Sequence, residues 1–264
     1  MKVEVLASVM NQSPERIAEQ MQLDSDAVII NQCDRLDYEE IEHRGYAIRF
    51  FSFPDRGVGR SRNEAILRAK GDICLFSDQD IVYEPGYAQA VSEEFRKNPD
   101  ADMILFEITV EENRRTYSIT RRKRVRWYNC GRYGAVSFAV RRESLISSGV
   151  TFSLLFGGGA RYSNGEDSLF LKEFMKKGYK VYTAPVTIGR EEAGESTWFD
   201  GYNEKFFRDR GVLYRYLYGR LDVIMALRFL LVHRKKLCVE AGLWQCFRWM
   251  HSANRSSKSV EDTD

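Results

Sequence analysis

Two aspartates behind an apolar run are the first residues of this sequence whose types and spacing could do chemistry. Asp78 and Asp80 follow the run from Asp72 to Ser77, which has the composition of a buried strand. Carboxylates two positions apart at a strand end can hold a divalent cation, and such a cation neutralises charge on a departing diphosphate. Asp is also common in turns, so the pair alone equally predicts a simple turn.

A second acidic pair, Glu166 and Asp167, follows Asn164-Gly165 and a flexible run of three glycines at residues 157–159. The pair begins a stretch typical of a helix, and the helix dipole favours the ionised form of a carboxylate in the first turn. Asp167 is therefore a candidate general base for a substrate hydroxyl. Acids also stabilise a helix start without any catalytic role, and that interpretation stays open.

A glycine-containing segment, Asp55 to Asn63, opens another helix-like stretch. Its Gly57-x-Gly59 pattern lacks the third glycine of a dinucleotide-binding motif, because Arg62 occupies that position. A nicotinamide cofactor is excluded on that ground. Arg60 and Arg62 could instead meet an anionic ligand at the helix start, or Ser61 could serve as a plain helix cap.

Strand-like runs alternate with helix-like stretches over the first hundred residues, which predicts an α/β fold. The expected sheet is mostly parallel with helices on both faces, and its ligands lie beyond the carboxyl ends of the strands. Strands are expected at 3–9, 27–31, 46–52, 72–77, 102–110, 116–120, 135–140 and 179–184, and helices at 14–21, 61–70, 85–97 (with Pro85 in the first turn) and 166–177.

In order and spacing, these motifs resemble the family-2 glycosyltransferases, which have the GT-A fold, and in particular those of bacterial surface and capsular polysaccharide assembly. The resemblance covers roughly residues 1 to 200. The matching pieces are Gly59-Arg60-Ser61-Arg62-Asn63, Ala69-Lys70-Gly71-Asp72, Asp78-Gln79-Asp80, Pro85-Gly86-Tyr87, Gly165-Glu166-Asp167 and Gly178-Tyr179-Lys180-Val181.

The resemblance implies a role for each matching position. It implies a UDP-sugar donor, a Mn²⁺ or Mg²⁺ cofactor, inversion at the anomeric carbon and a glycan or lipid-linked sugar acceptor. The implied roles are Asp80 as metal ligand, Asp78 on the ribose or a metal-bound water, Arg62 on the nucleotide, Ser8, Met10 and Gln32 around the base, Asp167 as catalytic base, and Glu166 and Trp198 on the acceptor side.

Two departures from the family pattern bear on these roles. The second strand ends in Asn31-Gln32-Cys33-Asp34 rather than in an acidic pair, although an amide can still pair with a uracil edge. The family often places a His between positions equivalent to 187 and 198, and none occurs here. Glu191, Glu192, Glu195 or water could take that place.

Composition narrows the classes of function. The 264 residues carry 40 Lys and Arg against 38 Asp and Glu, which does not favour a nucleic-acid partner. The five cysteines contain no C-x-x-C pair, so neither a disulfide framework nor a structural zinc site is predicted. Without the apolar run of a secretory signal, a cytoplasmic location is expected.

The resemblance also suggests a division of the chain. The expected GT-A catalytic domain is 1–200, with a nucleotide-sugar-binding half at about 1–110 and an acceptor half at 111–200. A basic, aromatic helical region would follow at 201–251 and a disordered polar tail at 252–264. The helical region could lie on the inner face of an anionic membrane or pack on the domain, and its most apolar part, Leu221 to Val232, is too short to span a bilayer.

The expected function is therefore a metal-dependent glycosyltransferase that moves a hexosyl or N-acetylhexosaminyl group. Two alternatives stay open: a sugar-phosphate nucleotidyltransferase and a non-catalytic module that binds sugars or lipid head groups. The absence of glycine from residues 7–16 disfavours the first, and the presence of both Asp78/Asp80 and Asp167 disfavours the second. The basic stretch from Arg121 to Tyr128 predicts a solvated hairpin or a contact with acceptor phosphate.

Overall fold

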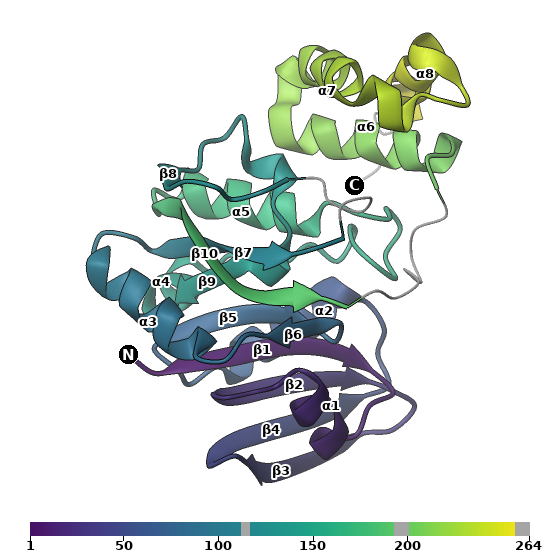
Figure 1. The fold of residues 1–264 in the computed structure, drawn as a ribbon. Coiled ribbons are helices and arrows are strands. Elements are labelled where there is room, and N and C mark those ends of the chain that lie inside the picture. Colours follow the sequence, from purple (N-terminus) through teal and green to yellow (C-terminus); the bar gives the residue numbers. More distant parts are fainter. Residues whose placement is uncertain (112–116, 193–200, 257–264) are drawn as a thin grey trace.

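The computed structural model describes residues 1–111, 117–192 and 201–256. Its strands form one mixed sheet in the order β3-β4-β2-β1-β5-β9-β7-β10-β6, with β8 paired to β10 (Figure 1). The strands are β1 Val3–Met10, β2 Asp26–Gln32, β3 Asp37–His43, β4 Tyr46–Phe53, β5 Ile73–Asp78, β6 Ile81–Tyr83, β7 Met103–Thr109, β8 Lys123–Arg124, β9 Phe138–Arg141 and β10 Val181–Glu191.

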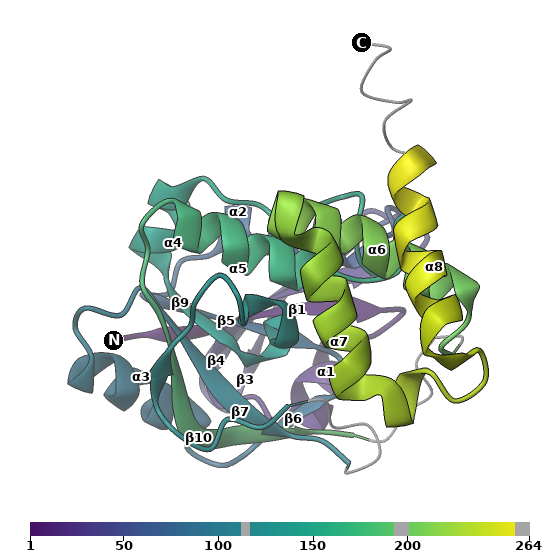
Figure 2. The same ribbon diagram turned by 90° about the horizontal axis from the view of Figure 1, so that it is seen from above.

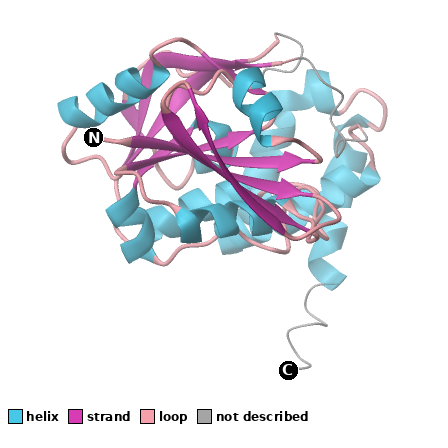
Figure 3. Cartoon of the chain, turned by 90° about the horizontal axis from the view of Figure 1, so that it is seen from below, coloured by secondary structure: helices cyan, strands magenta, loops and turns pink. Residues whose placement is uncertain are grey.

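Six of the described strands lie parallel to a neighbour, as the alternation of strands and helices predicts. Strands β4, β2, β1 and β5 run parallel, and so do β7 and β10, while β9 lies antiparallel between β5 and β7. Figure 3 shows the strands as one twisted sheet with helices around it. The predicted α/β class is confirmed.

Helices cover both faces of the sheet (Figure 2). Residues of α1 and α3 share one apolar core with the sheet, and residues of α2, α4 and α5 share a second core on the opposite face. The helices are α1 Pro14–Gln20, α2 Val58–Arg68, α3 Tyr87–Lys97, α4 Arg142–Ser148, α5 Glu166–Lys176, α6 Glu204–Tyr218, α7 Asp222–Leu237 and α8 Gly242–Ser256, with short 3₁₀ turns at Cys130–Arg132, Ala135–Ser137 and Gly219–Leu221.

Strand pleating decides which polar side chains meet at the carboxyl edge. Successive side chains of a strand point to opposite faces. Leu6 of β1, Ile30 of β2 and Phe76 of β5 lie in the core beneath α2 and α5. The residue two positions later in each strand has the same orientation. Ser8, Gln32 and Asp78 therefore continue that face to the edge of the sheet, below the starts of α2 and α5.

A buried ion pair holds the opposite, amino-terminal side of the sheet. Glu4 Oε1 lies 2.7 Å from Arg49 Nη2, and both side chains are less than one tenth exposed. Glu4 Oε2 also accepts from the backbone amides of Lys70 at 2.6 Å and Gly71 at 2.9 Å. A Cβ on Gly71 would lie 2.6 Å from Glu4 Cβ, so glycine is required where the chain enters β5.

Several predicted boundaries were wrong for identifiable reasons. Helix α2 begins at Val58, three residues early, because Gly57 with φ of 120° starts it. Helix α3 begins only at Tyr87, since Gly86 adopts a left-handed conformation and leaves Pro85 outside the first turn. Residues 117–120 form no strand, and 3₁₀ geometry replaces the first half of the strand expected at 135–140.

Helices α6, α7 and α8 form a bundle with an apolar core of its own, to which Phe156 also belongs. In Figure 1, α6 lies nearest the sheet, while α7 and α8 stand farthest from it. Helix α8 runs to Ser256, past the predicted start of a disordered tail at residue 252. Within the described ranges, no helix is long and apolar enough to cross a membrane.

Candidate functional site

One buried arginine joins the two acidic motifs. Arg62 lies in the second turn of α2, and its side chain is only 4% exposed. Its Nη2 donates to both carboxylate oxygens of Asp78 at 3.1 Å. Its Nη1 donates to Glu166 Oε1 at 3.0 Å and to Asp167 Oδ1 at 2.9 Å. We call Arg62, Asp78, Glu166 and Asp167 the arginine–carboxylate cluster.

The start of α5 is fixed by glycines that admit close contacts. Gly165 caps the helix with φ of 120°, and its amide donates to Glu166 Oε2 at 3.1 Å. A Cβ on Gly157 would lie 2.8 Å from the carboxylate carbon of Glu166. The first glycine of the 157–159 run thus makes room for an acidic side chain, a steric role that the sequence analysis did not assign to it.

The pKa of Asp167 differs from what the helix dipole predicts. Burial raises the pKa of Asp167 well above its usual value, and repulsion from Glu166 raises it further, while Arg62 lowers it. The Asp167 side chain still has 23% of its surface exposed. Desolvation and a neighbouring acid therefore outweigh the helix dipole, and they make Asp167 a stronger proton acceptor than an ordinary aspartate.

Arg62 remains a cation despite its burial. Desolvation by itself lowers the pKa of Arg62, but attraction from Asp78, Asp167 and Glu166 outweighs it, so the net pKa is raised. One buried polar atom of the side chain, Nε, has no hydrogen-bond partner in the described part of the chain. One guanidinium facing three carboxylates leaves a net negative site.

The residues expected around a nucleotide base come together at the same edge. Ser8 lies opposite Asp78 in the β1–β5 register, and Met10 lies opposite Gln32 in the β1–β2 register. Ser8 Oγ is buried without a hydrogen-bond partner among the described residues. Gln32 Oε1 accepts from the amide of Gly57 at 2.7 Å, which ties β2 to the start of α2.

The second carboxylate of the 78–80 pair lies in the turn between β5 and β6. The backbone oxygen of Asp80 accepts from the amide of Glu192 at 2.8 Å, so the end of β10 is adjacent. No group of three His, Cys, Asp or Glu residues that could hold a metal occurs in residues 1–111, 117–192 and 201–256. Trp198 and Glu195 lie outside the described residues.

This donor set fits one mode of metal binding. Mg²⁺ and similar hard cations are commonly held by one or two carboxylates together with substrate phosphates. Both oxygens of Asp78 accept from Arg62, so Asp78 could offer a metal only the lone pairs that Arg62 leaves. The chain would thus supply one or two oxygen ligands and a diphosphate the others.

Sequence reasoning missed the link between α2 and the loop before the glycine run. Asn63 Oδ1 accepts from the amide of Phe152 at 2.8 Å, and its Nδ2 donates to the Phe152 carbonyl at 2.9 Å. The Phe152 ring lies 5.3 Å from the Arg62 guanidinium carbon. No local pattern in the sequence predicts a contact between residues that are 89 positions apart. Only the helical position of Asn63, next to Arg62, could be expected from the sequence.

The basic stretch from Arg121 to Tyr128 forms no hairpin of its own. Only Lys123–Arg124 is a strand, and it pairs antiparallel with β10. Trp127 and Tyr128 are each about half exposed, and the Trp127 ring lies 6.4 Å from that of Tyr218 in α6. The stretch therefore lies against the helical bundle through Trp127.

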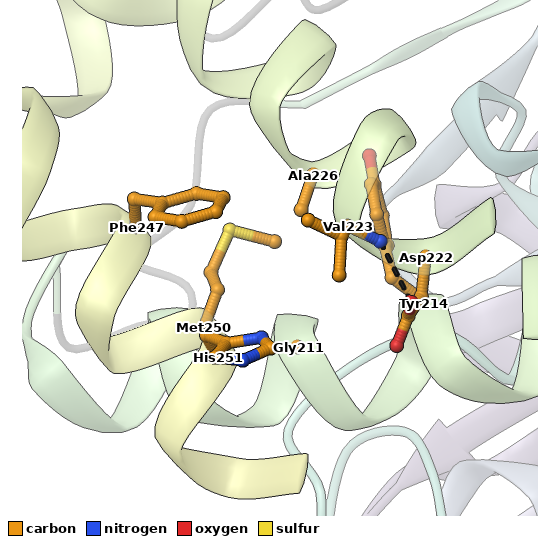
Figure 4. Close-up of a pocket in the computed structure, with 8 residues that line it drawn as sticks. All are labelled: Gly211, Tyr214, Asp222, Val223, Ala226, Phe247, Met250 and His251. Carbon is orange, nitrogen blue, oxygen red and sulfur yellow. Dashed lines mark hydrogen bonds between the residues drawn. The ribbon is translucent and has the colours of Figure 1, made fainter. Parts of the chain in front are cut away.

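A small pocket lies inside the helical bundle, away from the sheet edge (Figure 4). Gly211 lets the backbone of α8 approach α6 closely there, since a side chain at this position would collide with Met250. Its walls are mostly apolar and include no member of the arginine–carboxylate cluster. The lining residues are Gly211, Tyr214, Asp222, Val223, Ala226, Phe247, Met250 and His251.

Several solved structures share the fold of this chain at low sequence identity. S. aureus TarS 1-349 is 13% identical, with a TM-score of 0.61 and coverage of 96% of this chain and 81% of that chain. The same protein in complex with UDP-GlcNAc is 15% identical, with a TM-score of 0.60 and coverage of 91% of this chain and 74% of that chain. The mannosyltransferase PcManGT from Pyrobaculum calidifontis, in complex with GDP-Man and Mn²⁺, is 15% identical. Its TM-score is 0.57, and the match covers 98% of this chain and 75% of that chain. The fold is GT-A.

Comparison of the sequence with protein families identifies the family of this chain. No curated protein sequence matches this chain. The family described as "Glycosyl transferase family 2" matches residues 3–149, which is more than half of the chain and includes β1 to β9 with the first acidic motif. The chain is a member of glycosyl transferase family 2.

Proposed function

We propose that this protein transfers a sugar from a nucleoside-diphosphate sugar to an acceptor hydroxyl with inversion at the anomeric carbon. The observation that carries the proposal is the arginine–carboxylate cluster. Its Asp78 lies at the strand edge where GT-A donors bind, and its Asp167 lies at the start of a distant helix. A direct transfer needs a donor site and a base close together, and Arg62 contacts both acids.

The donor would lie over the ends of β1, β2 and β5. Structural neighbours hold UDP-GlcNAc or GDP-Man, which supports a nucleotide sugar. We assign the base to Ser8, Met10 and Gln32. The oxygen of Gln32 is occupied by Gly57, so its amide NH₂ would donate to a carbonyl of the base, as uracil requires. The unpartnered Ser8 hydroxyl would gain a partner.

A divalent cation, Mn²⁺ or Mg²⁺, held by Asp80 and the donor diphosphate would offset negative charge on the leaving group. The net negative cluster, with Asp78 next to Asp80, favours such a cation. We assign Asp78 to the ribose or to water on the metal, because Arg62 occupies both of its carboxylate oxygens.

Asp167 would perform the proton transfer. It accepts the proton of the acceptor hydroxyl while that oxygen forms a bond to the anomeric carbon, and the bond from that carbon to the diphosphate oxygen breaks. Attack from the face opposite the leaving group inverts the configuration. The raised pKa of Asp167 makes it a stronger proton acceptor, and the Arg62 guanidinium favours its ionised form. We assign Glu166 and Trp198 to the acceptor side.

We further propose a hexosyl or N-acetylhexosaminyl transfer in bacterial surface polysaccharide or glycolipid assembly, on a glycan or lipid-linked acceptor, with the enzyme at the cytoplasmic side. The sequence motifs of residues 59–80 and 165–181 support this setting through their resemblance to such enzymes. The catalytic domain would end near residue 200, and the helical bundle would form a separate region after it.

Release of nucleoside diphosphate, measured with UDP-Glc, UDP-Gal, UDP-GlcNAc and GDP-Man, tests the proposal. We expect one UDP-sugar to raise the Tm in the presence of Mn²⁺, since a ligand that binds only the native state stabilises it. Acceptor should accelerate diphosphate release from that donor. Release of pyrophosphate from UTP and a sugar phosphate would instead indicate a nucleotidyltransferase, and binding without turnover a non-catalytic module.

A further inference from the structure

Helix α7 buries one face and leaves the opposite face uncovered. Its buried residues Asp222, Ala226, Leu230 and Leu237 recur at spacings that place them on one side of the helix. The residues on the other side point away from the bundle. We define the outer face of α7 as Ile224, Arg228, Leu231, Val232 and Lys235.

The outer face of α7 exposes three aliphatic side chains where a helix packed on a domain is normally polar. Ile224 is 64% exposed, Leu231 is 47% exposed and Val232 is 66% exposed. Single exposed apolar residues are ordinary, but neighbouring ones on a single helix face mark an interaction surface. Val239 in the connection to α8 and Trp244 in the first turn of α8 are also exposed, at 73% and 68%.

The exposed charges of α7 are all positive. Arg228, Arg234, Lys235 and Lys236 are exposed, and the single acid of the helix, Asp222, is 4% exposed. Residues 201–256 carry 11 Lys and Arg against 4 Asp and Glu, whereas the rest of the chain carries 29 against 34. The positive charge of this nearly neutral protein is therefore concentrated in the bundle.

We propose that the outer face of α7 docks on an anionic lipid surface, with its aliphatic side chains among the acyl chains and its cations on the lipid phosphates. An exposed aliphatic stripe flanked by basic side chains has this chemistry. A second copy of the chain fits less well. A two-fold contact through this face would bring Arg228 and Lys235 against the same cations of the partner without an acid between them.

The docked orientation also suits the proposed reaction. Helix α6 connects the bundle to the start of α5, since Asp209 Oδ2 accepts from the amide of Ser163 at 2.9 Å and Leu213 packs against Gly165. In Figure 1 and Figure 2, α7 lies on the outer side of that bundle. Docking would hold the acceptor side of Asp167 near the membrane, where a lipid-borne hydroxyl arrives. Only this consequence rests on the proposed function.

Sedimentation of the full chain with vesicles tests the docking. The protein should bind vesicles of phosphatidylcholine mixed with phosphatidylglycerol, bind phosphatidylcholine alone much less, and dissociate as salt rises. Each basic residue near an anionic surface contributes about fivefold to affinity, so Arg228→Gln/Lys235→Gln should weaken binding by about 25-fold. Ile224→Ser/Leu231→Ser should also weaken it.

A matched control tests whether any exposed aliphatic side chains, rather than those of the outer face of α7, cause vesicle binding. Leu67→Ser/Ile146→Ser removes two aliphatic side chains that are 76% and 50% exposed on α2 and α4, and it should bind like the wild type. Equal binding to both vesicle types, or to neither, would overturn the proposal. So would a wild-type dimer in light scattering that Ile224→Ser/Leu231→Ser converts to monomers without any vesicle binding.

The activity of the same variants distinguishes docking from catalysis. Diphosphate release with a water-soluble acceptor should be unchanged in both outer-face variants, because neither touches the arginine–carboxylate cluster. If the wild type binds anionic vesicles but transfers no sugar, the proposed function fails and the docking stands. If it transfers sugar but ignores anionic vesicles, the docking fails alone.

Discussion

Replacement of Asp167 by Asn separates the proposed base from a structural role. The amide keeps the shape of the side chain but cannot accept a proton. Arg62 would retain its bonds to Glu166 and to both oxygens of Asp78, and the new amide oxygen can still accept the fourth. The cluster should therefore survive, and the change should act on the chemical step.

The expected effects on rate and stability have opposite signs. Loss of general base catalysis costs about 10²–10⁴-fold in kcat, which is about 3–5 kcal/mol of barrier height. The pKa of Asp167 is raised in the folded state, so its contribution to stability is present below the unfolded pKa of about 3.9 and is lost as pH rises through the folded value. At neutral pH, Asp167→Asn should thus leave the Tm unchanged or higher.

Steady-state release of nucleoside diphosphate with and without acceptor measures the rate, and thermal shift with a donor titration measures donor affinity. Glu166→Gln serves as the neighbouring comparison and should reduce the rate less. Asp100→Asn is the matched surface control, because Asp100 is an exposed carboxylate that accepts from Tyr182 at 3.0 Å far from the cluster.

Three results would refute this assignment. Retention of wild-type kcat in Asp167→Asn would mean that another group takes the proton. A larger loss in Glu166→Gln would move the base to Glu166. A large drop in donor affinity with a small change in kcat would place Asp167 in the donor site instead.

Three further perturbations probe the cluster, the metal and the fold. The acidic limb of the kcat/KM profile should lie above the range of an ordinary carboxylate and should move to still higher pH in Arg62→Gln, since Arg62 lowers the pKa of Asp167; an unshifted limb would contradict this. A chelator should abolish turnover, and added Mn²⁺ should restore it. The Asp80→Asn variant should fold normally but gain little activity from Mn²⁺. Full activity in excess chelator would exclude the metal role. Glu4→Gln should lower the free energy of unfolding in urea by about 3–5 kcal/mol, because Arg49 would remain buried without its anion, while activity per folded molecule stays normal.

Local patterns in the sequence were enough for much of the fold. Apolar runs of strand length, such as the one ending at Ser77, gave β5, and the stop at Gly178 gave the end of α5. Strand β3 was not predicted, because Asp37–His43 is polar and lies at the sheet edge with its side chains largely exposed. A buried strand is recognised in a sequence by its apolar residues, and an exposed edge strand has few of them.

The site divides in the same way. The sequence by itself predicts one shared chemistry for Asp78, Arg62 and Asp167, because their motifs follow in the order of one enzyme family. The family resemblance also implied that Ser8 and Gln32 lie after the first two strands, and parallel pairing brings both strand ends to the same edge of the sheet.

Only the tertiary structure decided how the acids interact. Arg62 meets Glu166 and Asp167 across more than 100 residues of chain, and no local pattern encodes such a contact. Tertiary packing reverses the inference from the helix dipole: desolvation of Asp167 and repulsion from Glu166 raise its pKa although Arg62 lowers it, whereas its position in the first helical turn predicts a lowered pKa. Helix position is a property of neighbouring residues, but desolvation depends on everything that packs around the group.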